Sequence, residues 1–352
     1  MDAGPVLEAA RRLVDDGTTP ACQIAVAHDG EVVCFETFGA ATNATRFCVF
    51  SATKPIVASA VWILVGEGLL DPNRPVAHYI PEFASNGKES VTVEQVLLHT
   101  SGFPNAPIDA VEGGDAVTRV KRFTEWRLEW EPGSCFEYHA TSAHWVLAEL
   151  IERLSGHDFR DYIETRVCAP NGLPRVLGLS PEEQDDIANG VPLGAAPAGS
   201  DLIAIDGSVL DRPAVRAAGV PSGGAIMTAE TMVRFYQALL HDPNRVWDAD
   251  VLRDAKTNVR CTFDDPLMKV SANRSLGLVL AGDDGLHQFR YAMFGKDNSP
   301  GSFGHAGAFS QIAWADSETG ISFSFLKNGL QADMMADAVK VIPVTDAAAA
   351  LA

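Results

Sequence analysis

Ser51 and Lys54 are the residues of this chain whose types and spacing best fit covalent chemistry. They stand at the start of an apolar stretch, Pro55 to Val65, which predicts a helix. Positions i and i+3 share a helix face, so the lysine amine can reach the serine hydroxyl and take its proton. Ser51 is therefore a candidate nucleophile. Serine is also a favoured helix N-cap, so on this motif alone both interpretations stay open.

The same S-x-x-K spacing occurs at two other places in the chain. Ser85 and Lys88 enclose Asn-Gly, a polar pair typical of a loop. Ser324 and Lys327 lie in an alternating run typical of a strand, where positions i and i+3 point to opposite faces. Only Ser51 precedes a long apolar helix, so the sequence around it must decide its role.

Composition limits the classes of function. The chain has 352 residues, enough for two lobes with sizeable cores, and 47% of them are hydrophobic. Its net charge of −19 disfavours nucleic acid and anionic membranes as partners. The first residues contain no basic region followed by an apolar region, as a signal peptide would, and no run of 18 apolar residues occurs. We therefore expect a cytoplasmic protein that binds neither nucleic acid nor membrane.

Metal-ligand patterns are absent from the sequence. The six cysteines are scattered without a C-x-x-C pair, and we expect them to be reduced thiols. His139 and His144 are five positions apart, whereas helical metal ligands stand four apart, and no H-E-x-x-H motif occurs. No metal and no other cofactor is expected.

The order of predicted elements indicates the fold class. Strand-like runs lie at both ends of the chain, and helices dominate the middle, with no convincing strand between residues 69 and 200. This order favours an α+β fold in which an antiparallel sheet, flanked by helices, carries an all-helical insertion lobe. We expect a sheet lobe from residues 1–70 plus 215–352 and a mainly helical and loop lobe from 71–214. Ser51 would lie in the cleft between them. The alanine-rich tail 347–352 is expected to fray.

Five motifs in order along the chain give a resemblance to a known family. They are F-S-A-T-K at 50–54, L-L-H-T-S-G-F at 97–103, P-G-x-x-F-x-Y at 132–138, the Gly-rich stretch 219–229 and G-H-A-G at 304–307. The chain resembles the serine β-lactamase and penicillin-binding-protein superfamily, in its class C β-lactamase-like branch and closest to family VIII carboxylesterases. No G-x-S-x-G occurs, so an α/β-hydrolase nucleophile is not supported.

This resemblance implies roles for individual residues. Ser51 would form an acyl-enzyme, Lys54 would take its proton and Tyr138 would relay that proton to the leaving group. The backbone N–H groups of Ser51 and Ala308 would form the oxyanion hole. The substrate would be a small acyl compound. The side chains and backbone around it would come from four further positions: His305, Gly307, His139 and Ala140.

Two departures from the family pattern bear on the substrate. β-Lactamases of this branch have an Asn that binds an amide where this chain has Ala140, and a Lys-Thr-Gly motif where it has His305-Ala306-Gly307. Both changes favour a carboxylesterase on small acyl esters. The alternatives are a β-lactamase, a D-amino-acid peptidase or amidase, an acyltransferase with the same nucleophile, or a catalytically silent binding protein. Specificity should come from the loops around 104–125 and 170–220, and the sequence leaves the oligomeric state open.

Overall fold

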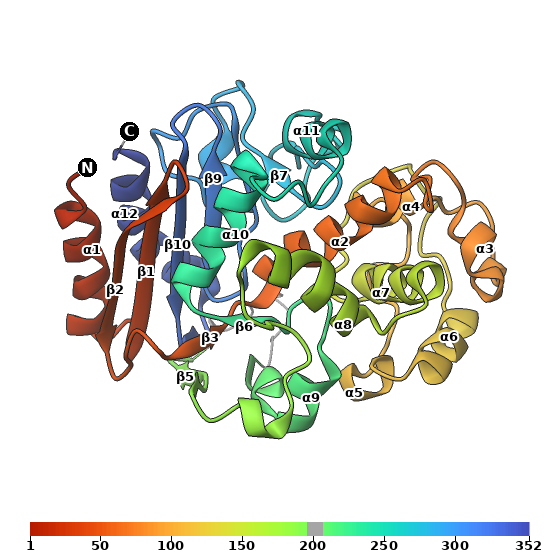
Figure 1. Cartoon of the computed structure of the whole chain (residues 1–352), viewed down its shortest axis with the longest axis horizontal. Helices are drawn as coiled ribbons and strands as arrows, with labels where there is room; N and C mark the ends of the chain where they lie inside the picture. The colour runs from red at the N-terminus through yellow and green to blue at the C-terminus, as the bar shows by residue number, and fades with distance from the viewer. Residues whose placement is uncertain (196–206, 352) are drawn as a thin grey trace.

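A six-stranded antiparallel sheet forms the larger lobe of the protein (Figure 1). The computed structural model describes residues 1–195 and 207–351. The strand order is β2-β1-β10-β9-β8-β7, so strands from the two ends of the sequence meet where β1 pairs with β10. The strands are β1 (Ala21–His28), β2 (Glu31–Gly39), β7 (Val279–Leu280), β8 (Ser302–Gly304), β9 (Ile312–Asp316) and β10 (Ile321–Lys327). The predicted sheet assembled from both chain ends is confirmed.

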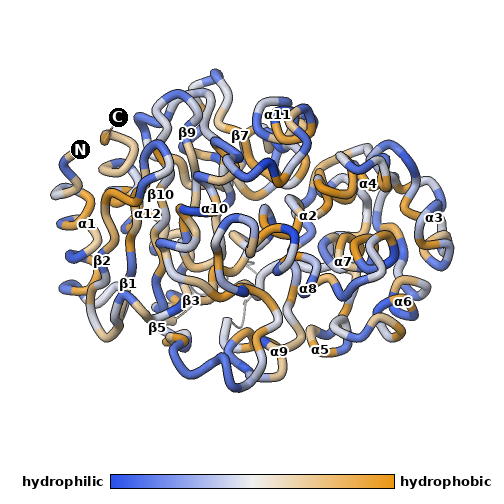
Figure 2. The backbone as a smooth tube through the Cα atoms, viewed as in Figure 1, coloured by the Kyte–Doolittle hydropathy of each residue, from blue (hydrophilic) through white to orange (hydrophobic). Residues whose placement is uncertain are grey.

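Helices cover both faces of this sheet, and β1 shows why. Its residues alternate in size, so that Ile24 and Val26 face one way while Ala25 and Ala27 face the other. The larger side chains pack against α1 (Gly4–Asp15) and α12 (Met334–Ala349). The alanines leave room on the opposite face for α10 (Ala229–His241) and α2 (Lys54–Gly66). α1 alternates between hydrophilic and hydrophobic residues, as an amphipathic covering helix should (Figure 2).

The second lobe is mainly helical and packs against α2. Its central helix α7 is buried along most of its length and packs against α2, which therefore contributes to both lobes (Figure 1). The helices of this lobe and of the connections to the sheet lobe are α3 (Val76–Tyr79), α4 (Val93–Leu97), α5 (Ala110–Gly113), α6 (Ala116–Glu125), α7 (Ser142–Ser155), α8 (Phe159–Ile163), α9 (Pro213–Ala218) and α11 (Ala249–Thr257).

The absence of strands between residues 69 and 200 is a wrong prediction. Two short strands, β4 (Ile187–Ala188) and β5 (Val191–Leu193), occur there. β4 pairs with β3 (Arg46–Cys48), which also pairs with β6 (Ile226–Met227), and β5 pairs with β11 (Gly329–Gln331). Strands of two or three residues carry no readable periodicity, and they form here because distant partners supply the hydrogen bonds. Of the loop predicted around 170–220, residues 196–206 lie outside the described part of the chain.

The C-terminal tail is also more ordered than expected. Residues up to Ala349 belong to α12, and Ala348 is fully buried in the cluster that includes α1. The alanines therefore gain tertiary packing against α1, which an isolated low-complexity tail would lack.

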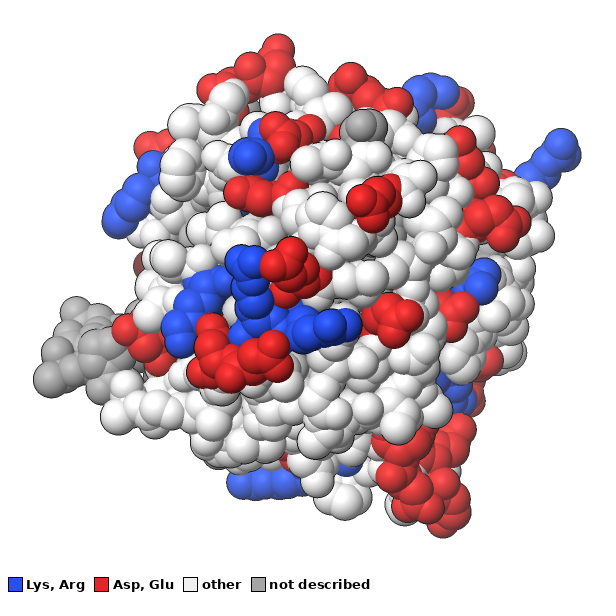
Figure 3. All heavy atoms as spheres, turned by 90° about the vertical axis from the view of Figure 1, so that its left-hand side faces the viewer, with Lys and Arg blue, Asp and Glu red and all other residues white. Residues whose placement is uncertain are grey.

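The acidic residues form no single dominant patch on the face of the molecule shown in Figure 3. There, acidic residues form several separate groups, and basic residues lie among them. Within residues 1–195 and 207–351, no helix is long and apolar enough to cross a membrane.

Candidate active site

The segment that carries Ser51 runs directly from a buried strand into a helix. After β3, the Val49 N–H donates to the Ala225 carbonyl oxygen at 3.0 Å, which fixes the chain before the turn. Phe50 then adopts a left-handed backbone conformation with φ of 47°, unusual for a bulky residue and common at functional turns. A 3₁₀ turn (Phe50–Thr53) leads into α2. Ser51 lies in this turn, makes no N-cap bond and is half-buried, so the N-cap interpretation is wrong.

Lys54 is the first residue of α2, and its amine lies 3.3 Å from Ser51 Oγ. The side chain is 1% exposed. Its Nζ donates to the carbonyl oxygens of Ala140 at 2.9 Å and Ser222 at 2.8 Å. Burial, and secondarily the cation of Arg274, hold the pKa of Lys54 well below its usual range. The site therefore favours a neutral amine beside the serine.

Tyr138 lies beside the amine of Lys54. Its ring centroid lies 4.9 Å from Lys54 Nζ. Its hydroxyl makes no hydrogen bond of good geometry with any described residue, although the hydroxyls of Ser51 and Tyr291 lie near enough to influence its pKa. Burial raises the pKa of Tyr138 well above its usual value, while Arg274 opposes this rise. The phenol is thus neutral at rest and free to exchange a proton with a neighbour.

The loop after β8 brings Ala308 towards the serine segment. A Cβ on Gly307 would stand 2.2 Å from the Val49 carbonyl oxygen, so the two backbones touch and only glycine fits. The rings of Phe50 and Phe309 pack edge to face at 5.2 Å. The Ala308 N–H donates to no described residue, and the N–H of Ser51, in the first turn of a helix, has no acceptor within that helix. Two free donors therefore lie on adjoining segments, as an oxyanion hole requires.

His305, predicted to bind substrate, is completely buried. Its Nδ1 lies 2.7 Å from the Ala306 carbonyl oxygen, so Nδ1 carries the proton and Nε2 accepts from Arg274 Nη1 at 2.9 Å. Burial and Arg274 hold the pKa of His305 well below its usual range. The structure places this neutral ring behind Tyr138 and Tyr291, with centroids at 6.0 and 5.4 Å.

His139, also predicted to bind substrate, is buried as well and fastens the Tyr138 segment to its neighbour loop. Its Nε2 accepts from the Phe103 N–H at 3.2 Å and contacts Ser101 Oγ at 3.0 Å, while Nδ1 donates to the Glu137 carbonyl at 2.6 Å. Burial lowers its pKa to about 4. Ala140 is exposed, and it is its carbonyl that contacts Lys54.

Sequence reasoning missed three contributors to the site: Arg274, Tyr291 and the carbonyl of Ser222. Arg274 and Tyr291 lie in stretches without a motif, and their partners come from positions far away in the sequence. Ser222 belongs to the Gly-rich stretch 219–229, whose sequence by itself indicates no role for this carbonyl. No group of three or more His, Cys, Asp or Glu residues in the described chain is placed to hold a metal ion.

Comparison with solved structures defines the fold. A crystal structure of a family VIII carboxylesterase superposes with a TM-score of 0.81 at 23% identity, covering 98% of this chain and 96% of that one. A penicillin-binding protein homologue from Caulobacter crescentus gives a TM-score of 0.78 at 25% identity, with the same two coverages. The chain therefore has the fold shared by β-lactamases, penicillin-binding proteins and these esterases.

Sequence comparison gives the family. The Beta-lactamase family profile matches residues 7–344, and the chain belongs to that family. Among curated proteins, Esterase/beta-lactamase LipL of Mycobacterium tuberculosis is 27% identical over 320 residues, which cover 80% of this chain and 69% of LipL. The resemblance drawn from the five motifs is thus confirmed.

Proposed function

We propose that the protein is a serine hydrolase that forms an acyl-enzyme on Ser51 and acts mainly as a carboxylesterase on small acyl esters. The observation that carries this proposal is the environment of Lys54. A neutral amine has two N–H groups and one lone pair. The carbonyls of Ala140 and Ser222 accept the two N–H groups, which leaves the lone pair for the Ser51 hydroxyl proton.

The reaction follows from this arrangement. Ser51 Oγ bonds to the ester carbonyl carbon while its proton passes to Lys54 Nζ, and the carbonyl electron pair moves onto oxygen. The N–H groups of Ser51 and Ala308 stabilise that oxyanion. The carbonyl then re-forms, the bond to the alcohol oxygen breaks, and the alcohol takes the proton from Lys54 through Tyr138. Water hydrolyses the acyl-enzyme by the same steps in reverse order.

Two features support esters over amides. Ala140 has no side-chain amide with which to bind a substrate amide group, and buried His305 offers no cation to the cleft in place of the family lysine. Relatives named as esterases agree with this preference, and LipL carries both names.

The test is hydrolysis of p-nitrophenyl acetate and butyrate by the wild type and Ser51→Ala. We expect kcat/KM to fall at least about a thousandfold in the variant, because the nucleophile is lost. Intact-mass analysis after mixing with ester should show one acyl group on the wild type and none on Ser51→Ala. Esterase activity that survives the substitution would refute the assignment.

An amide-bond enzyme is the second candidate, because the same nucleophile and the family name allow it. Turnover of nitrocefin faster than of p-nitrophenyl butyrate would favour a β-lactamase, and acyl transfer to added amines or alcohols would favour an acyltransferase. A catalytically silent binding protein predicts no labelling of Ser51 by a fluorophosphonate probe.

A further inference from the structure

Arg274 is a buried cation at the junction of the lobes. Its backbone is held by a bridge to Cys261, with N–H to O distances of 3.0 and 3.1 Å. The side chain is 1% exposed. The backbone of Arg274 is thus anchored, and burial confines its side chain.

Aromatic rings surround this guanidinium. Its central carbon lies 5.5 Å from the ring centroid of Phe136, 5.2 Å from Tyr138 and 5.7 Å from Tyr291. These distances lie within the range of about 6 Å at which cations are attracted to ring faces. Its Nη1 contacts His305, while Nε and Nη2 have no hydrogen-bond partner among the described residues. Arg274 thus contacts Tyr138 itself and other aromatic side chains of the site.

No carboxylate of the described residues pairs with Arg274 within 4.0 Å. Asp265, the carboxylate that influences it from a distance, accepts the N–H groups of Leu267 and Met268. The equally buried Arg119, in contrast, pairs with Glu149 at 2.7 Å. A buried charge without a counter-ion is unfavourable for folding, and such charges concentrate at functional sites.

We propose that Arg274 is an electrostatic positioning residue for proton transfer in this site: its fixed charge disfavours a second cation on Lys54 and favours negative charge on Tyr138. The central carbon of the Arg274 guanidinium and Lys54 Nζ lie 5.2 and 4.9 Å from the centroid of the same Tyr138 ring. The proposal rests on the proposed hydrolase function.

The other titratable groups around Lys54 supply no competing charge. Three histidines face the site: His99 from the loop after α4, His144 from α7 and His305 from the end of β8. Burial keeps the pKa of each well below its usual range. Burial likewise raises the pKa of Tyr291, and of Cys261 beside Arg274, so both stay neutral near pH 7. Of these groups and Arg274, only Arg274 is charged near neutral pH. Asp265 is a carboxylate that acts on Arg274 from a distance.

The experiment is the pH profile of kcat/KM for p-nitrophenyl butyrate, whose ascending limb reports loss of the Lys54 proton. Arg274→Met removes the charge and keeps the length, while Arg274→Lys keeps the charge. We expect the limb to move up by about one pH unit or more in Arg274→Met, which lowers the rate on that limb about tenfold. The limb should stay near its wild-type position in Arg274→Lys.

Arg260→Gln is the matched control. Its backbone N–H donates to the Arg274 carbonyl, but its side chain is partly exposed and pairs with Glu94 and Asp254. The same change in formal charge should leave the limb in place, because solvent and two carboxylates already screen it.

Three results would overturn the inference: an unshifted limb in folded Arg274→Met, an equal shift in both Arg274 variants, or a wild-type limb near the ordinary lysine pKa of about 10.4. The position of the wild-type limb is measured without any variant, so this test remains available even if Arg274→Met fails to fold. Labelling of Ser51 by a fluorophosphonate separates this outcome from failure of the hydrolase proposal, which would leave Ser51 unlabelled.

Discussion

The chemistry proposed for Ser51 depends on how the hydrogen atoms of Lys54 are distributed. The carbonyls of Ala140 and Ser222 are fixed parts of two loops, and both lie within 2.9 Å of Nζ. An amine bound in this way needs no reorganisation before it accepts a proton from Ser51, which is the advantage of a preorganised site. The i to i+3 spacing of Ser51 and Lys54 only brings the two side chains close to each other.

Gly307 offers a test at the scale of one residue. Gly307→Ala would place a methyl group against the Val49 carbonyl oxygen at 2.2 Å and push the loop with Ala308 away from Ser51. We expect kcat/KM for p-nitrophenyl butyrate to fall by about 10²–10³, the usual effect of losing one oxyanion donor.

Gly301→Ala is the control for this substitution, because the nearest atoms to its added methyl belong to the flexible Glu318 side chain at 3.4 Å. It should keep wild-type kinetics. Wild-type turnover by Gly307→Ala would contradict the role given to the 307–308 backbone.

At the scale of elements, α12 contacts the loop that carries Ala308 through Asp337, which also forms a buried ion pair. Asp337 of α12 pairs with Lys327 of β10 at 3.0 Å, and both side chains are fully buried. The second carboxylate oxygen of Asp337 accepts a hydrogen bond from Ser310 Oγ at 2.7 Å. Phe309 and Ser310 both have left-handed backbones, with φ of 57° and 59°. This unfavourable loop conformation is therefore held by a contact outside the loop.

Ser310→Ala tests that contact. The variant should lose about 0.5–1.5 kcal/mol of stability, the usual net value of one hydrogen bond. Because the loop is released two residues from Ala308, kcat for p-nitrophenyl butyrate should fall while KM changes little. Steady-state kinetics and urea unfolding measure the two effects.

Ser324→Ala is chemically the same change at another buried serine, whose hydroxyl has no partner among the described residues. It should leave kcat unchanged. Equal kcat in both variants would show that the Ser310 bond does not position the loop.

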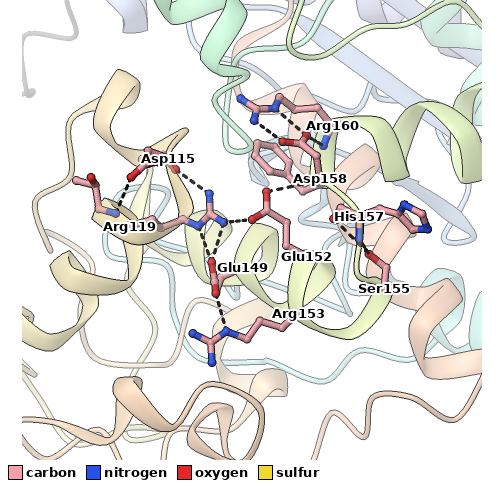
Figure 4. A network of polar contacts seen from close by, with 12 residues as sticks. Asp115, Arg119, Glu149, Glu152, Arg153, Ser155, His157, Asp158 and Arg160 are labelled. Atoms are coloured by element: carbon pink, nitrogen blue, oxygen red, sulfur yellow. Dashed lines mark hydrogen bonds and ion pairs between the residues drawn. The ribbon is translucent and has the colours of Figure 1, made fainter.

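At the scale of the whole molecule, the helical lobe has its own polar anchor, shown in Figure 4. Arg119 of α6 is fully buried and donates to Glu149 of α7 at 2.7 and 3.0 Å, and to Glu152. Arg153 also donates to Glu149, at 2.7 Å. This network joins α6 to the helix that packs on α2, so it stabilises the lobe without touching the site.

Arg119→Met should therefore lower the free energy of unfolding by about 3–5 kcal/mol, because it leaves Glu149 buried without its main partner. Chemical denaturation measures this loss, and kcat per folded molecule should stay at the wild-type level. Arg122→Met, on the same helix with a solvent-exposed side chain paired to Glu112 and Glu125, should leave the free energy of unfolding nearly unchanged. Equal losses in the two variants would refute the anchor.

The sequence alone was sufficient for the parts of this protein that local patterns encode. The α+β class, the strands at both ends of the chain and the helices in its middle follow from periodicity. Ser51, Lys54 and Tyr138 were found because each lies in a short motif. Their order along the chain pointed to the family.

Tertiary structure alone decided the contacts between distant segments. The strands β4 and β5 exist only through their partners, and Arg274 enters the site although nothing near it in sequence signals a function. His305 and His139 are in the predicted neighbourhood, but packing buries them behind Tyr138 and beneath its loop. Burial and the placement of charge set the protonation of Lys54, and both depend on which distant residues the fold brings together.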